Sequence, residues 1–169
     1  AAKQRYKLLG TDIEDVKKEL LEVNNLALEG KPEDMVITSH ICRGNYHSTF
    51  FTSGPYDSVA DYVFAKENVD ALFLEYDDAR SGGFAPLAKV SPDKKVVLGL
   101  ITTKTPELED KEVVIKRIHE AAKYIPLDRL YLSPQCGFAS CEIGNKLTEE
   151  EQWAKLKLVK EIAEEVWGE

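Results

Sequence analysis

The chain has few cysteines, no long apolar run and no excess of basic residues. Its three cysteines are an odd number, which argues against a disulfide scaffold and favours a reducing compartment. No apolar run approaches the roughly 20 residues that a membrane-spanning helix needs. The 30 acidic residues outnumber the 22 basic ones, whereas a nucleic-acid partner would require clustered Lys and Arg. We therefore expect a cytoplasmic protein that partners neither a membrane nor a nucleic acid.

The residues that are present suffice for one folded domain. The 169 residues are 43% hydrophobic and 31% charged, which suits an ordinary core under a polar surface. No linker or low-complexity segment divides them, so we expect a single domain over 1–169. Apolar periodicity predicts these elements: a helix from Thr11 (its N-cap) to 27, strands at 35–41, 71–76, 96–101 and 130–133, and helices at 57–66, 111–124 and from 148 onward.

Apolar stripes predict how the first and last of these helices face the core. On the first helix the stripe is Ile13, Val16, Leu20, Val23 and Ala27. On the last helix it is Trp153, Leu156, Val159, Ile162 and Val166.

A helix followed by four strand–helix units predicts an α/β fold with a parallel sheet and right-handed crossovers. The uniformly apolar run 96–101 is typical of a strand covered on both faces. The strands have the spacing of a (β/α) barrel, but a whole barrel needs eight units and about 250 residues. The sequence thus predicts either a small doubly wound sheet or the C-terminal half of a TIM (β/α)8 barrel.

Four side chains of the types that bind zinc lie at the ends of predicted strands. His40 and Cys42 follow the apolar start of the first strand, Glu75 closes the second, and Cys136 follows the fourth. Residues two apart in an extended segment point to the same side, and the carboxyl ends of parallel strands build the sites of α/β proteins. Two thiolates, an imidazole and a carboxylate suit zinc, whereas magnesium and calcium prefer oxygen. We interpret the four as one metal site.

Each of these residues alone has a more ordinary explanation. A lone cysteine is usually a buried small apolar side chain, and His-x-Cys by itself is a weak pattern. Glu75 is more informative, because an acid that closes an apolar strand has no evident structural task. Cys136 lies in the tight loop 134–137, which could bring its thiolate near a ligand. It is the four together that favour a metal.

Other polar residues carry weaker arguments. Cys141 is expected to be a free thiol, His47 a loop residue and His119 a helix-surface residue. For the polar group that follows Glu75, an ion pair or plain solvation is as well supported as substrate contact; this group is Asp77, Asp78 and Arg80.

Three segments carry a family resemblance: 39–45 (Ser-His-Ile-Cys-Arg-Gly-Asn), 73–77 (Phe-Leu-Glu-Tyr-Asp) and 132–140 (Leu-Ser-Pro-Gln-Cys-Gly-Phe-Ala-Ser). They resemble cobalamin-independent methionine synthases, and most closely the short bacterial methionine-synthase-like proteins that have only the catalytic barrel. The likeness runs along the whole chain but covers only the second half of the family's barrel. Its specific element is the order His-x-Cys, Glu, Pro-x-Cys-Gly, each after a strand.

The resemblance implies a zinc-dependent methyltransferase of methionine biosynthesis. His40, Cys42, Glu75 and Cys136 would be the zinc ligands, and Glu75 would be the one that yields to the incoming thiol. The family transfers a methyl group from 5-methyltetrahydrofolate (5-methyltetrahydropteroyltriglutamate) to the zinc-bound thiol of homocysteine. Zinc keeps such a thiol deprotonated at neutral pH and thereby supplies a nucleophile.

Two departures from the family pattern limit this implication. Methionine synthases proper have a His-Ser-Pro element after the strand that matches 96–101, and its His is taken as the proton donor to the folate. Here 101–104 reads Ile-Thr-Thr-Lys, and Thr102 is no equivalent acid. The half-barrel that holds the amino-acid end of homocysteine is also not represented.

These departures leave three interpretations open. The first is a fragment with little or no activity by itself, which pairs with another copy or belongs to a longer protein with the missing N-terminal half-barrel. The second is alkyl transfer to another small thiol from a corrinoid or other donor. The third is a non-catalytic domain whose zinc is bound by four protein ligands and has no open coordination position.

Overall fold

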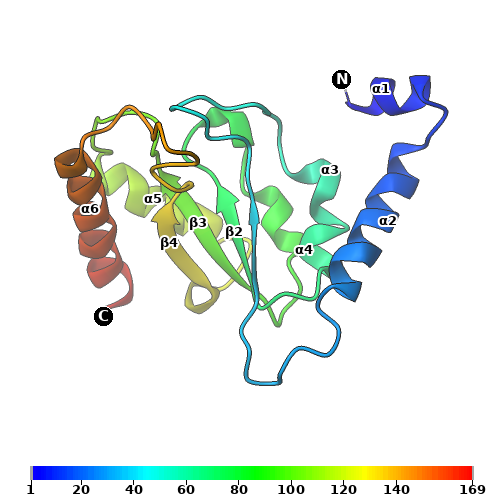
Figure 1. The fold of residues 1–169 in the computed structure, drawn as a ribbon. Coiled ribbons are helices and arrows are strands. Elements are labelled where there is room, and N and C mark those ends of the chain that lie inside the picture. The colour runs from blue at the N-terminus through cyan, green and yellow to red at the C-terminus, as the bar shows by residue number, and fades with distance from the viewer. Residues whose placement is uncertain (1, 169) are drawn as a thin grey trace.

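A computed structural model, which describes residues 2–168, shows four parallel strands in the order β1-β2-β3-β4 (Figure 1). The strands are β1 (Thr38–Ile41), β2 (Ala71–Glu75), β3 (Lys95–Ile101) and β4 (Leu130–Pro134). The α-helices are α1 (Ala2–Leu8), α2 (Ile13–Leu26), α3 (Asp57–Ala60), α4 (Val63–Lys66), α5 (Lys111–Ala121) and α6 (Glu149–Trp167). Three 3-10 turns complete the list: η1 (Ala79–Ser81), η2 (Ala85–Lys89) and η3 (Leu127–Arg129).

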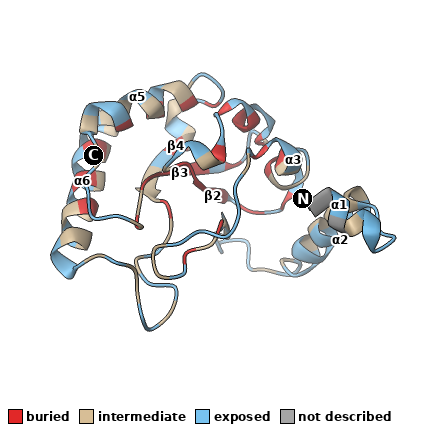
Figure 2. Ribbon diagram, turned by 90° about the horizontal axis from the view of Figure 1, so that it is seen from above, coloured by how far each residue is buried: buried red, intermediate tan, exposed pale blue. Residues whose placement is uncertain are grey.

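The helices that pack on the sheet lie along one side of it. Seen from above, α3, α5 and α6 follow the convex side of the curved sheet, and the opposite side is occupied by loops (Figure 2). A doubly wound sheet would carry helices on both faces, whereas a barrel carries them only outside. The predicted α/β fold is therefore confirmed, and of its two forms the half of a (β/α)8 barrel is the correct one.

The two faces of the sheet differ in exposure as this arrangement requires. Leu72, Leu98 and Leu130 point to the helices and are fully or almost fully buried. On the other face Phe73 is only half-buried, and Tyr131 is 41% exposed although it stands beside Val97 in the ladder. This second face would be the interior of a complete barrel.

Most predicted elements are present with shifted bounds. The first strand begins only at Thr38, and Met35 and Val36 are exposed. The helix predicted at 57–66 is broken into α3 and α4 around Asp61. The N-cap of α2 is Asp12, not Thr11, because the Asp12 carboxylate accepts the backbone N–H of Glu14.

The predicted apolar stripes on α2 and α6 are wrong in part. No described residue of α2 is buried, and its Leu20, Val23 and Leu26 are more than half exposed. The helix contacts the end of α4 through polar groups instead, for example Asn24 Nδ2 to Oε1 of Glu67, the residue that follows α4, at 3.1 Å.

On α6, Trp153 is 60% exposed, and the buried residues are Lys155, Leu158 and Ile162. The row that faces the core thus includes a lysine, which an apolar pattern passes over. Among residues 2–168, no helix is both long and apolar enough to cross a membrane.

Candidate metal centre

The four predicted ligands meet at the carboxyl end of the sheet. His40, Cys42, Glu75 and Cys136 each offer a ligand atom, and these atoms all lie within 4.8 Å of one another. The Cys42 and Cys136 Sγ atoms are 4.0 Å apart, and His40 Nε2 lies 3.6 Å from Glu75 Oε1. The convergence predicted from the strand ends is what the structure shows; their role as ligands remains a prediction.

Strand register places these side chains. His40 pairs with Phe73 in the β1–β2 ladder, and Glu75 lies two residues beyond Phe73, so both point to the same face. Cys42 comes directly after β1 ends. Cys136 follows β4 after Gln135, whose backbone N–H donates to the carbonyl of Ile101 at 2.7 Å.

A close approach between β3 and β4 brings the Cys136 loop inward. The ladder shifts register between Gly99 and Ile101, as at a β-bulge. A Cβ on Gly99 would lie 2.7 Å from Gln135 Cα and 2.9 Å from the Leu74 carbonyl oxygen. Only glycine fits there. Gly99 was not predicted as part of the site, although a glycine inside a buried strand is a recognised sign of close backbone approach.

The carboxylate of Glu75 is held from one side only. Its Oε1 accepts the backbone N–H of Arg43 at 3.0 Å, whereas Oε2 is buried with no hydrogen-bond partner among the described residues. An unpaired buried carboxylate oxygen costs free energy. The oxygen near His40 is Oε1, 3.6 Å from His40 Nε2, and a zinc ion bound by this carboxylate would offset the cost of burying its charge.

Tyr56 fixes the backbone of Glu75, and Arg43 in turn holds Tyr56. The hydroxyl of Tyr56 accepts the Glu75 N–H at 2.9 Å and lies 3.3 Å from its carbonyl oxygen. The guanidinium of Arg43 stacks 4.2 Å from the centre of the Tyr56 ring and donates to the Gly54 carbonyl. Neither role was expected, because the partners are distant in sequence.

Charge is strongly coupled within the cluster. Hydrogen bonds to Cys136 and then to Glu75 raise the pKa of His40 to about 10. The bond to His40 in turn lowers the pKa of the Cys136 thiol. Burial alone would raise the pKa of Glu75, but the bonds from His40 and from the Arg43 N–H lower it overall. The metal-free cluster therefore favours a protonated imidazole beside anionic partners.

The donor geometry fits zinc. Ligands at zinc bond lengths in a tetrahedron stand about 3.3–3.8 Å apart, close to the 4.0 and 3.6 Å seen for the sulfur pair and the His–Glu pair. Shifts below about 1 Å would therefore close the cage.

A groove of about 410 Å³ runs beside the cluster on the open face of the sheet. Its lining residues come from β1, β2 and the end of β4: Thr38, His40, Phe73, Ser133, Pro134, Gln135, Cys136 and Gly137. A ligand in this groove would touch two of the four candidate metal ligands.

The remaining candidates lie elsewhere or are paired. Cys141 is a free, half-buried cysteine outside the cluster, and His119 is exposed on α5. Arg80 forms ion pairs with both Asp77 (2.9 Å) and Asp78 (2.7 Å). Of the interpretations left open for this group, the ion pair is the one that the structure shows.

Fold and site define a class: a barrel-type parallel β/α domain with a thiol-rich candidate metal centre at the carboxyl ends of its strands. Comparison with known proteins agrees. The family model described as "Cobalamin-independent synthase, Catalytic domain" matches residues 18–165. The chain belongs to this family, which confirms the resemblance noted in its motifs.

Relatives and solved structures agree with this assignment. The Bacillus subtilis proteins YxjG and YxjH, both uncharacterized, are 51% and 54% identical over 97% and 94% of this chain. A Bacillus licheniformis 5-methyltetrahydropteroyltriglutamate–homocysteine methyltransferase is 25% identical over 99% of it. A solved protein from Listeria monocytogenes, provisionally named a vitamin-B12-independent methionine synthase, is 43% identical over 95% of this chain, with a TM-score of 0.73.

Coverage in the opposite direction is much lower. The chain spans 44% of YxjG, 42% of YxjH, 20% of the B. licheniformis enzyme and 44% of the Listeria chain. What is described here thus corresponds to less than half of each relative.

Proposed function

We propose that this chain carries the metal-binding half of the active site of a zinc-dependent S-methyltransferase. The observation that carries the proposal is the convergence of two thiols, an imidazole and a carboxylate within 4.8 Å, with one oxygen of Glu75 buried and unbonded among residues 2–168. His40, Cys42, Glu75 and Cys136 would hold the ion. Bound zinc would supply a Lewis acid that keeps a substrate thiol deprotonated near pH 7.

The acceptor and donor follow from family membership and the name of one relative. The B. licheniformis relative is named for transfer from 5-methyltetrahydropteroyltriglutamate to homocysteine, and we propose homocysteine as acceptor and the methyl-folate as donor in the longer protein. The groove beside His40 and Cys136 would receive the thiol end of the acceptor.

Glu75 would be the ligand that gives way to the thiol. Its Oε1 already has a partner in the Arg43 N–H, so the carboxylate can leave a metal without becoming wholly unsatisfied. The cysteine sulfurs have weaker alternatives, such as the 3.3 Å contact of the Gly44 N–H with Cys42 Sγ.

A second candidate keeps the site and changes the donor. The loop after β3 offers no imidazole, because Thr102 and Thr103 stand there and Thr103 is fully buried against Gln135. A donor whose leaving group needs no proton from this loop, such as a methyl-corrinoid, would suit it. Turnover of the longer protein with methyl-folate against methylcobalamin separates the two donors.

The open face of the sheet would be the surface that contacts a partner. We propose that it is covered by the N-terminal half-barrel of a longer protein or by a second copy, since Tyr131 and Phe73 would otherwise face solvent. Sedimentation of the chain by itself distinguishes self-association from a monomer. A site that needs reduced thiolates also suits the cytoplasm.

The test of the metal site is a direct one. The protein is purified under reducing conditions, and its zinc is measured by mass spectrometry for wild type, Cys136→Ser and Cys141→Ser. We expect about one zinc per chain in wild type and in the Cys141 control, and loss of most zinc in Cys136→Ser, because the hydroxyl is a poor substitute for a thiolate. Stoichiometric zinc retained by Cys136→Ser would show that the ligand set is wrong.

A further inference from the structure

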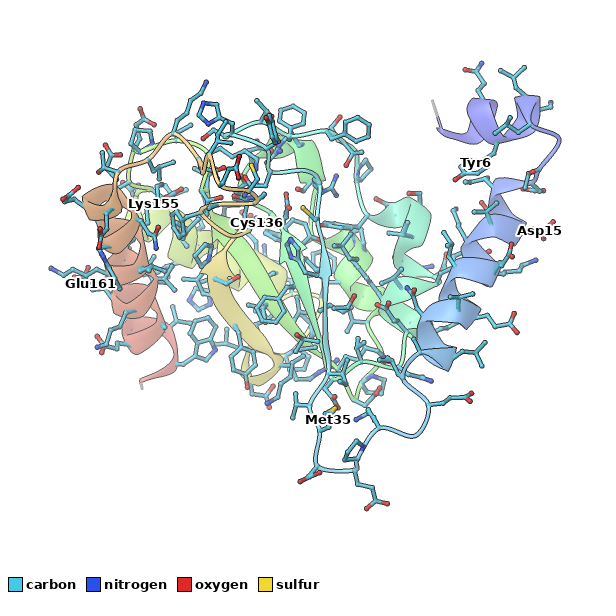
Figure 3. All side chains as sticks on the ribbon, in the orientation of Figure 1. Tyr6, Asp15, Met35, Cys136, Lys155 and Glu161 are labelled. Carbon is cyan, nitrogen blue, oxygen red and sulfur yellow. The ribbon has the colours of Figure 1, made fainter. Side chains whose placement is uncertain are left out.

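Lys155 is the one fully buried lysine of the described chain, and its charge is fully compensated. Its Nζ, on α6, donates to the Glu107 carbonyl at 2.7 Å and lies 3.2 and 3.1 Å from the two Glu109 carboxylate oxygens. In Figure 3 this side chain lies at α6, and the labelled Cys136 lies toward the centre of the molecule. A buried charge is costly to retain, which indicates a role beyond filling space.

The partner of Lys155 continues toward the metal cluster. Glu109 Oε1 accepts the backbone N–H of Thr102 at 2.7 Å, which fixes the first residue after β3. The next residue, Thr103, donates its N–H and its hydroxyl to Gln135 Oε1 at 2.9 and 2.7 Å. Gln135 immediately precedes Cys136.

The side-chain amide of Gln135 has a fixed orientation, although this orientation leaves one buried polar atom unpaired. Because the Thr103 N–H can only donate, the amide of Gln135 must present its oxygen there. Its Nε2 is then buried without a partner among the described residues. A flipped amide would leave Thr103 unsatisfied instead, so the loop that Glu109 anchors fixes the side chain next to Cys136.

We infer that Glu109, whose charge Lys155 compensates, is a positioning residue for the metal centre, which acts through the Thr102–Thr103 backbone on Gln135 and so on Cys136. This rests on the proposed function only in that Cys136 is taken as a metal ligand. Groups that orient metal ligands from outside typically account for 10- to 100-fold in metal affinity. An ion pair that served stability alone would leave the Cys136 loop and zinc affinity unchanged.

Two double variants isolate the transmitted contact. Both remove the two charges of the ion pair: Lys155→Met/Glu109→Gln keeps an acceptor for the Thr102 N–H, and Lys155→Met/Glu109→Met does not. We expect zinc affinity within threefold of wild type in the first and at least tenfold weaker in the second. We also expect the backbone amide NMR signals of Thr103 and Cys136 to shift in the second, metal-free protein relative to the first.

A matched control is the ion pair of Lys111 on α5 with Glu165 on α6, at 2.6 Å. Lys111→Met removes a lysine–glutamate contact to the same helix and is expected to leave zinc affinity and the Cys136 amide signal unchanged. Equal zinc affinity and equal Cys136 signals in the two double variants would overturn the inference. The amide measurement needs no metal, so it decides the matter even if wild type binds no zinc.

Discussion

The sulfur atoms of Cys42 and Cys136 lie 4.0 Å apart although 94 positions separate the two residues in the chain. Cys42 lies in the loop after the edge strand β1, and Cys136 lies in the loop after the edge strand β4. Glu75 and His40 lie beside the two sulfur atoms. The same closeness exposes the pair to oxidation when no metal is bound, since two thiols so placed need only small movements to bond.

We therefore predict that peroxide links Cys42 to Cys136 in the metal-free protein, and that zinc protects them. Peptide mapping after alkylation should find this disulfide, with Cys141 still alkylated because it stands outside the cluster. A disulfide that involves Cys141, or equal oxidation with and without zinc, would contradict the geometry.

Zinc affinity should rise with pH. With a pKa raised to about 10, His40 holds a proton at neutral pH that must leave before Nε2 can bind a metal. Protons compete with zinc for His40 most strongly at low pH, and this competition disappears above a pH of about 10. The zinc affinity therefore increases as the pH rises toward that value. Calorimetry in two buffers of different ionisation enthalpy should show the proton release. The exposed His119→Gln should match wild type, and zinc binding that releases no proton near neutral pH would refute the assignment.

Gly99→Ala should destabilise the fold and weaken zinc binding together. The new methyl group would meet the Leu74 carbonyl oxygen in β2 and the Cα of Gln135, the residue after β4, below 3.0 Å, and such overpacking costs about 1–3 kcal/mol. Urea unfolding and a zinc titration measure the two effects. Gly83→Ala is the control, because a Cβ there meets nothing within 4 Å. A wild-type unfolding midpoint in Gly99→Ala would show that the strands can move apart freely.

Tyr56→Phe should cost about 1–3 kcal/mol of unfolding free energy, because the buried Glu75 N–H loses its acceptor. Zinc affinity should fall as well, since the carboxylate is carried by that backbone. Tyr124→Phe, at a 45% exposed position, is expected to change neither quantity. If Tyr56→Phe lowers stability but binds zinc normally, the hydroxyl does not position Glu75.

The sequence predicted the strands, their parallel order and the meeting of the four donors because these depend on local apolar runs and on one topological rule. It did not predict which residues support the donors. Lys155 interrupts an apolar stripe and becomes buried only because Glu109, 46 positions away, compensates its charge. Tyr56 and Gly99 act through backbone contacts between elements, which no pattern of side chains records. Trp153 was misplaced because helical periodicity identifies a stripe but not the neighbour it meets.

The spread of the four donors over three strands has a mechanical consequence. A cation held by all of them would tie β1 to β4 across the rim of the sheet, as a cross-link that closes a loop spanning the 94 positions between Cys42 and Cys136. The strand it would secure most is β1, the short edge strand whose residues are all at least partly exposed. Loss of the metal and fraying of that edge would then be a single event.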